Sequence, residues 1–136
     1  MKKFIFAAAA ALTLSACVEP IPKAELPVQK ASIPQSTVNM VHAVMREKMK
    51  DPESAKFRRL VTYRSGLGDQ IICGEYDAKN SYGGYTGYKN YYARVRGGEI
   101  LIMHTDSTGS YTDYAHQGCA QAATGKIIAP AAHVTG

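Results

Sequence analysis

The stretch between residues 88 and 105 decides the fold, and it reads Tyr88-Lys89-Asn90-Tyr91-Tyr92-Ala93-Arg94-Val95-Arg96-Gly97-Gly98-Glu99-Ile100-Leu101-Ile102-Met103-His104-Thr105. Tyr91, Ala93 and Val95 recur with a period of two, which predicts a strand with these side chains on one face. Gly97-Gly98 is typical of a two-residue hairpin turn, whose central positions favour a positive φ. The apolar run 100–103 predicts a second strand that is central in the sheet or covered on both faces.

Two further strands are predicted upstream of this hairpin. Residues 57–64 alternate in character, residues 65–69 carry the Gly and Ser of a turn, and residues 70–76 form the next strand. A Gly/Tyr-rich loop connects residue 76 to the strand that begins at residue 88, and the four consecutive strands predict an antiparallel meander.

An amphipathic helix is predicted before these strands. Ser36 or Thr37 can cap its start, and Pro52 ends it near Lys50, because the residue before a proline avoids helical backbone angles. Its apolar side chains recur at intervals of three and four, at Val38, Val41, Val44, Met45 and Met49. The expected fold class is therefore α+β: one amphipathic helix packed on a four-stranded antiparallel meander sheet, within residues 36–121.

The beginning of the chain has the pattern of an export signal. Lys2 and Lys3 precede an apolar run at positions 4 to 14, and small residues follow that run. The run is too short to span a bilayer, which takes about 20 residues. We expect residues 1–16 to be a signal peptide that is removed from a single exported domain, since 136 residues allow no second one.

The end of this segment, Leu14-Ser15-Ala16-Cys17, resembles the lipobox of bacterial lipoprotein signals. The resemblance implies that Cys17 becomes the first residue of the mature protein and carries lipid, with the membrane as its partner. Several acyl chains bury enough CH₂ groups for lasting anchorage. In lipoproteins of this kind an Asp after the Cys favours the inner membrane, so Val18 at that position implies an outer-membrane lipoprotein.

Signal removal also changes the charge. The full chain has 16 Lys and Arg against 11 Asp and Glu, a net charge of +5, and loss of Lys2 and Lys3 lowers it to +3. A nucleic-acid-binding domain is usually strongly basic, so no nucleic-acid partner is expected.

Two flanking segments are predicted to lie outside the folded part. Residues 17–35 hold four of the six prolines, which favour an extended and unpacked tether behind the lipidated cysteine. Residues 122–136 are rich in Ala, Thr and Gly, and they are predicted to be a weakly ordered tail.

The two remaining cysteines predict a disulfide. Exported proteins meet an oxidising compartment, and Cys73 and Cys119 are the even pair left once Cys17 is lipidated. The bond would close a loop between cysteines 46 positions apart, and it would contribute about 4 kcal/mol to stability on the chain-entropy model.

Two sequence blocks resemble those of small, uncharacterised exported proteins and lipoproteins of proteobacteria and their phages. The blocks are K-D-P-x-S-A-x-F at residues 50–57 and C-G-x-x-x-A-K-N-S-x-G-G-Y-x-G at residues 73–87. The resemblance covers about residues 45 to 120 and implies one recurrent small domain. It implies no activity, substrate or cofactor.

The segment after the second predicted strand is the strongest candidate for a binding surface. Asn80, Tyr82, Tyr85 and Tyr88 lie among glycines, and tyrosine offers a large rigid contact area at low entropic cost. An envelope protein or a glycan would suit such a surface. The alternative is a turn whose tyrosines pack over the edge of their own sheet, in a purely structural envelope lipoprotein.

Catalysis and metal binding are not expected. Cys73 could act as a nucleophile with a nearby base, but no Cys-His spacing of a known kind occurs and an exported thiol oxidises. His104, Asp106, Asp113 and His116 lack the spacing of metal ligands, so no metal or cofactor is predicted.

A basic run precedes the first predicted turn. Between Arg46 and Arg64 seven basic residues stand against three acidic ones. These cations either face anionic envelope material or form a solvated helix face and a charge-blunted edge strand.

Overall fold

The computed structural model describes residues 23–107 and 113–130. In chain order the elements of these residues are β1 (Lys23–Lys30), α1 (Gln35–Glu47), the 3-10 turn η1 (Pro52–Ser54), β2 (Lys56–Ser65), β3 (Gln70–Asp77), β4 (Lys89–Arg96), β5 (Glu99–Thr105), α2 (Tyr114–Ala123) and β6 (Lys126–Pro130). The predicted signal peptide and Cys17 lie outside the described residues, as does the end of the predicted tail, 131–136.

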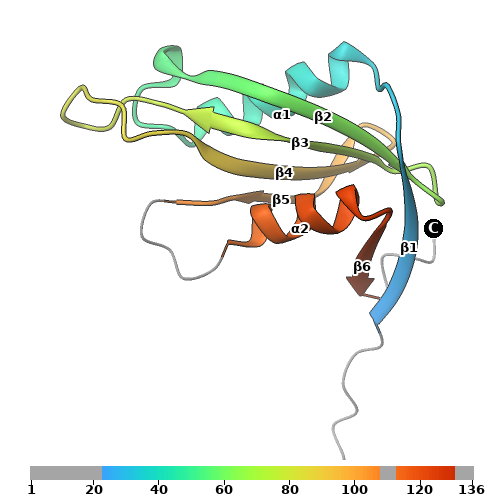
Figure 1. Cartoon of the computed structure of the whole chain (residues 1–136). Helices are drawn as coiled ribbons and strands as arrows, with labels where there is room; N and C mark the ends of the chain where they lie inside the picture. The colour runs from blue at the N-terminus through green and yellow to red at the C-terminus, as the bar shows by residue number, and fades with distance from the viewer. Residues whose placement is uncertain (1–22, 108–112, 131–136) are drawn as a thin grey trace, which may run out of the picture.

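The described strands form one antiparallel, curled sheet in the order β5-β4-β3-β2-β1-β6, with α1 on one face and α2 on the other (Figure 1). The α+β class and the meander from β2 to β5 are confirmed. The predicted count of four strands is wrong, because β1 and β6 extend the sheet beyond β2. A second helix, α2, was not predicted.

The prediction of an unpacked tether is wrong for β1. Leu26 and Val28 are buried while Glu25, Pro27 and Gln29 are exposed, so the segment has the period-two pattern of a half-buried strand. Pro27 is tolerated because its ring faces outward, and its carbonyl accepts a hydrogen bond of 2.8 Å from the Gly66 N–H. The prolines hid this alternation in the sequence.

The prediction of a weakly ordered tail is wrong for residues 122–130. Ala122 still belongs to α2, and β6 pairs with β1 from Lys126↔Pro27 onward. Ile127 is buried in the same apolar cluster as Leu26. A short strand of this kind gains its stability from the partner it pairs with, and that partner lies about 100 residues earlier in the chain.

The predicted helix is confirmed as α1, although it ends at Glu47 rather than near Lys50, and it covers one face of the sheet. Its buried residues Val38, Val41 and Met45 pack against alternate side chains of the strands, namely Ile72, Tyr91, Ala93 and Val95. The helix begins at Gln35, after Pro34, and neither predicted cap makes a side-chain cap bond.

Helix α2 packs on the other face, and a disulfide joins it to β3. The predicted Cys73–Cys119 bond is confirmed, with a Cα–Cα distance of 5.7 Å. Gly118 lets the helix approach the Tyr92 ring, since a Cβ at this position would lie 2.9 Å from a ring carbon. Ala115 and Ala122 complete the buried side of the helix.

The hairpin predicted at Gly97-Gly98 is present, with both glycines at positive φ. Its second strand, β5, is not central: it is the edge of the described sheet. The apolar run arises because both faces of β5 are partly covered. Ile100 packs toward the α1 side and Ile102 toward the α2 side. The run of apolar residues therefore indicates that both faces of the strand are covered, and not that the strand has a neighbour on each side.

The turn between β2 and β3 is fixed by a buried carboxylate. Asp69 is fully buried, and its oxygens lie 3.0 Å from Nε of Arg94 and 2.6 Å from Nε of Arg96. Ser65 Oγ accepts the Asp69 N–H at 3.1 Å. These ion pairs attach the predicted turn to β4, and the residue pattern of a single strand does not predict them.

Candidate functional site

The segment between β3 and β4, residues 78–88, forms a compact turn organised by Asn80. We call it the Gly/Tyr loop. The Asn80 side-chain oxygen accepts the N–H groups of Tyr82 at 2.9 Å and Gly84 at 3.2 Å. The Asn80 N–H donates to the Gly84 carbonyl at 2.9 Å, and Gly83 adopts a φ of 80° that favours glycine. Asn80 therefore shapes the loop, and its amide oxygen is already used.

The three predicted contact tyrosines differ in their surroundings. Tyr82 at the turn is 98% exposed. Tyr85 is 39% exposed and donates its hydroxyl to the Ser54 carbonyl at 2.8 Å, which ties the loop to η1. Tyr88 is 37% exposed and lies under the Arg58 guanidinium, 3.5 Å from the ring centre. Only Tyr82, among these three, offers both ring faces.

The start of β2 brings basic side chains to the same end of the sheet. The β2–β3 register shifts between Arg58 and Val61, and Arg59 takes a φ of 53° there. This bulge lets two consecutive arginines reach one carboxylate: Arg58 lies 2.6 Å and Arg59 3.2 Å from the oxygens of Glu75.

Two lysines converge on Tyr85. The Lys56 ammonium lies 4.3 Å and the Lys79 ammonium 5.8 Å from the centre of its ring. An ammonium over an aromatic face is attracted by the ring quadrupole, but two ammonium groups near one ring also repel each other. We call the whole group the loop-end patch: Lys56, Arg58, Arg59, Lys79, Tyr82, Tyr85 and Tyr88.

The sequence alone does not show that the basic members of this patch lie beside the Gly/Tyr loop. Both signals were visible, as a basic run before residue 64 and a tyrosine-rich loop after residue 79. Antiparallel pairing joins them, because Lys56 opposite Asp77 places the start of β2 beside the end of β3. The predicted meander places the basic run beside the tyrosine-rich loop, so these two features together indicate the patch.

Cys73 and Asp106, two of the residues considered for catalysis or metal binding, have structural roles. The Cys73 sulfur is bonded to Cys119. Asp106 accepts the N–H groups of Ala115 at 2.9 Å and His116 at 3.0 Å, so its carboxylate satisfies the first turn of α2. Across residues 23–107 and 113–130, no three His, Cys, Asp or Glu side chains gather as a metal site.

Two titratable side chains, His42 of α1 and Tyr91 of β4, meet between the helix and the sheet. A hydrogen bond of 2.8 Å joins Nε2 of His42 to the Tyr91 hydroxyl, and the His42 ring stacks on Phe57 at 3.7 Å. Burial, together with the nearby Arg46 charge, lowers the pKa of His42 to about 4. Burial raises the pKa of Tyr91 well above its usual range. Both groups are neutral at pH 7 and serve the core.

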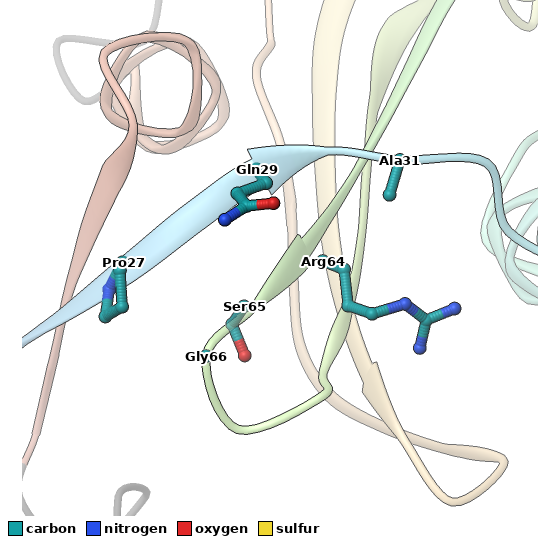
Figure 2. A pocket seen from close by; sticks show the side chains of 6 residues that line it. All are labelled: Pro27, Gln29, Ala31, Arg64, Ser65 and Gly66. Carbon is teal, nitrogen blue, oxygen red and sulfur yellow. The ribbon is translucent and has the colours of Figure 1, made fainter.

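A hollow of about 250 Å³ lies at the other end of β2, beside the β2–β3 turn (Figure 2). It is lined by Pro27, Gln29, Ala31, Arg64, Ser65 and Gly66. Two of these residues belong to β1 and Ala31 follows that strand, which is why the sequence did not indicate the hollow. Arg64 is its one charged side chain, and Ser65 Oγ, its one hydroxyl, accepts the N–H groups of Leu67 and Asp69.

Comparison with protein families, with characterised proteins and with solved structures finds no match for this chain. No relative therefore supplies a role for the loop-end patch. Neither α1 nor α2, the helices of the described part, is long and apolar enough to cross a bilayer.

Proposed function

We propose that the protein is a lipid-anchored lipoprotein of the bacterial outer membrane that works as a non-catalytic binding module. The Gly/Tyr loop is its contact surface. The observation that carries this proposal is the nearly complete exposure of Tyr82 on a loop whose backbone is held by Asn80. A rigid aromatic side chain in water contributes contact area to a partner without a large loss of conformational entropy.

The anchor in this proposal is the lipidated Cys17 that the lipobox implies. Because β1 begins at Lys23, the chain between the anchor and the sheet is short. Six residue steps span at most ~20 Å even when fully extended. The domain is thus held near the membrane that carries it, instead of at the end of the longer tether expected from the sequence.

A crosslinking experiment in intact cells tests the contact surface. A photoreactive phenylalanine analogue replaces Tyr82, and a control places it at Leu67, which is 42% exposed on the β2–β3 turn at the other end of the sheet. We expect position 82 to give a distinct crosslinked species and position 67 to give none of that species. Equal products from both positions, or none from position 82, would contradict the proposal.

The anchor has its own test. Mass spectrometry of the mature protein should find a lipidated amino terminus at Cys17, and Cys17→Ser should move the protein out of the membrane fraction. An amino terminus that still bears residues 1–16 without lipid would overturn the anchored form.

The second candidate is a purely structural envelope lipoprotein. The bond from Tyr85 to the Ser54 carbonyl and the stacking of Arg58 on Tyr88 favour it, because these contacts use the tyrosines to cover the sheet itself. This candidate predicts no crosslink at position 82.

A further inference from the structure

The loop-end patch carries more cations than the described residues pair with carboxylates. Lys56, Arg58, Arg59 and Lys79 supply four cations, and Glu75 is the one carboxylate paired with any of them within residues 23–107 and 113–130. The two acids of the neighbouring segment, Asp51 and Glu53, make no ion pair with these four among the same residues. An anionic group would complete this surface.

The two lysines around Tyr85 favour a bound anion most directly. Within the described part of the chain, neither the Lys56 nor the Lys79 ammonium lies within 4.0 Å of a carboxylate, although both approach the same ring. Holding like charges together costs free energy, and an anion placed between them would recover it.

Tyr82 adds the second half of a recognition surface. Its exposed ring lies three residues from Tyr85, on the loop that carries both. Aromatic faces stack on the C–H faces of sugar rings, whereas cations bind the acidic substituents of those rings. We propose that the loop-end patch binds an acidic polysaccharide, a glycan chain bearing carboxylate or phosphate groups. This inference rests on the proposed function and names its ligand class.

The position of the patch favours a glycan as its ligand, rather than the surface of the bilayer that anchors the protein. The beginning of β1 and the Gly/Tyr loop lie at opposite ends of the molecule in Figure 1. With ~20 Å or less between Cys17 and β1, the lipid lies near the β1 end. The patch is therefore presented away from the membrane that holds the protein.

Binding of alginate oligosaccharides to the disulfide-bonded domain tests the inference. Alginate carries one carboxylate on each pyranose ring, and dextran serves as the uncharged control. We expect alginate to bind and dextran not to bind, with affinity that falls steeply as salt is raised. Lys56→Gln together with Lys79→Gln should weaken alginate binding at least about fivefold and flatten its salt dependence. Tyr82→Ala should weaken it about fivefold with thermal unfolding unchanged.

The matched control removes the same two charges at the far end of the sheet. Arg64 and Lys126 are exposed and lie beside the β2–β3 turn and at the start of β6. Arg64→Gln with Lys126→Gln should bind alginate as the unaltered domain does. Equal weakening in this control would show that net charge alone causes binding, and the inference would be wrong.

Two further probes separate the ligand class from other acidic partners. Poly-glutamate offers carboxylates without sugar rings, and vesicles with about a third phosphatidylglycerol offer an anionic bilayer. Tighter binding of either than of alginate overturns the polysaccharide assignment. If position 82 crosslinks in cells while alginate does not bind, the inference fails and the proposed function stands. If neither occurs, both fail.

Discussion

At the scale of single residues, the contact between Gly74 and Tyr91 controls how β3 and β4 pack under α1. The two residues are direct cross-strand partners, and a Cβ on Gly74 would lie 2.7 Å from Cε1 and the hydroxyl oxygen of Tyr91. Tyr91 is fully buried and its hydroxyl bonds His42, so the ring has no free space into which it can move. The missing side chain at position 74 is what lets this aromatic lie flat on the sheet.

Gly74→Ala should therefore destabilise the domain by about 2 kcal/mol, because the overpacked ring must leave its rotamer or break the His42 bond. Urea unfolding measures the change. Gly84→Ala is the control: its nearest neighbour is 4.0 Å away and its backbone is not in the left-handed region, so we expect a change within about 0.5 kcal/mol. Equal effects of the two substitutions would contradict the packing argument.

His42 makes stability depend on pH. Its pKa is lowered from 6.5 to about 4 in the folded state, first by burial and then by Arg46. Between these two values the unfolded chain binds a proton that the folded protein refuses, so stability falls as pH is lowered from about 6.5 through 4. The loss amounts to about 1–2 kcal/mol after allowance for the partial exposure of the ring.

The measurement compares the free energy of unfolding at pH 7 and pH 4 in the unaltered domain and in His42→Gln. Gln keeps a hydrogen-bonding group for the Tyr91 hydroxyl but does not titrate. Carboxylates titrate in both proteins, so the difference between their two pH slopes isolates His42. Identical slopes would show that the imidazole is as accessible to protons when folded as when unfolded.

At the scale of secondary-structure elements, α2 begins with a cap that comes from another element. Asp113 occupies the cap position by sequence, but it makes no side-chain cap bond. The carboxylate of Asp106, just beyond β5, accepts the N–H groups of Ala115 and His116 instead, and it is buried. A negative charge at this end also interacts favourably with the helix dipole.

Asp106→Ala should cost about 2 kcal/mol, since it leaves two N–H groups at a buried helix start without acceptors. Asp113→Ala should cost less than about 0.5 kcal/mol, because no side-chain bond is lost. Thermal unfolding followed by circular dichroism compares the two variants. A larger effect at Asp113 would mean that Asp113, and not Asp106, caps the helix.

The sequence predicted the elements whose partners lie close by in the chain. The meander from β2 to β5 and helix α1 follow from alternation, turn glycines and helical spacing. It did not predict β1 and β6, because these strands pair with each other across about 100 residues of the chain, and β6 has only five residues. Leu26 and Val28 alternate with exposed residues, but the prolines among residues 17–35 are also typical of an extended tether.

For the candidate site, the loop residues were visible in the sequence and their surroundings were not. Tyr82, Tyr85 and Tyr88 were singled out together, yet one is open, one is bonded to Ser54 and one is stacked under Arg58. These differences depend on which strand end lies beside the loop. The sequence pattern shows which residue types the loop contains, whereas the register of the paired strands determines which residues lie beside them.

At the scale of the whole molecule, the curled sheet closes around α2 through β1. The first half of β1 pairs with β6 and its second half with β2, so this strand connects the meander to the C-terminal part of the fold. Leu26 and Val28 share one buried cluster with Ile71, Ala122 and Ile127. Removal of β1 would expose that cluster and leave β6 without its partner.

This arrangement gives a prediction that separates a strand from a tether. A chain that begins at residue 23 should fold as the mature protein does. A chain that begins at residue 31 should lose at least about 3 kcal/mol of unfolding free energy, because Ile127 and its neighbours no longer contact Leu26 and Val28. Chemical unfolding and hydrogen exchange of the β6 amides measure the two effects.

A point variant in the longer chain tests the same arrangement. Leu26→Ala should lose about 2–4 kcal/mol of stability, and Gln29→Ala, at an exposed site of the same strand, is its control. Equal stability of the two chain lengths would restore residues 23–30 to the tether and place the lipid anchor correspondingly farther from the domain.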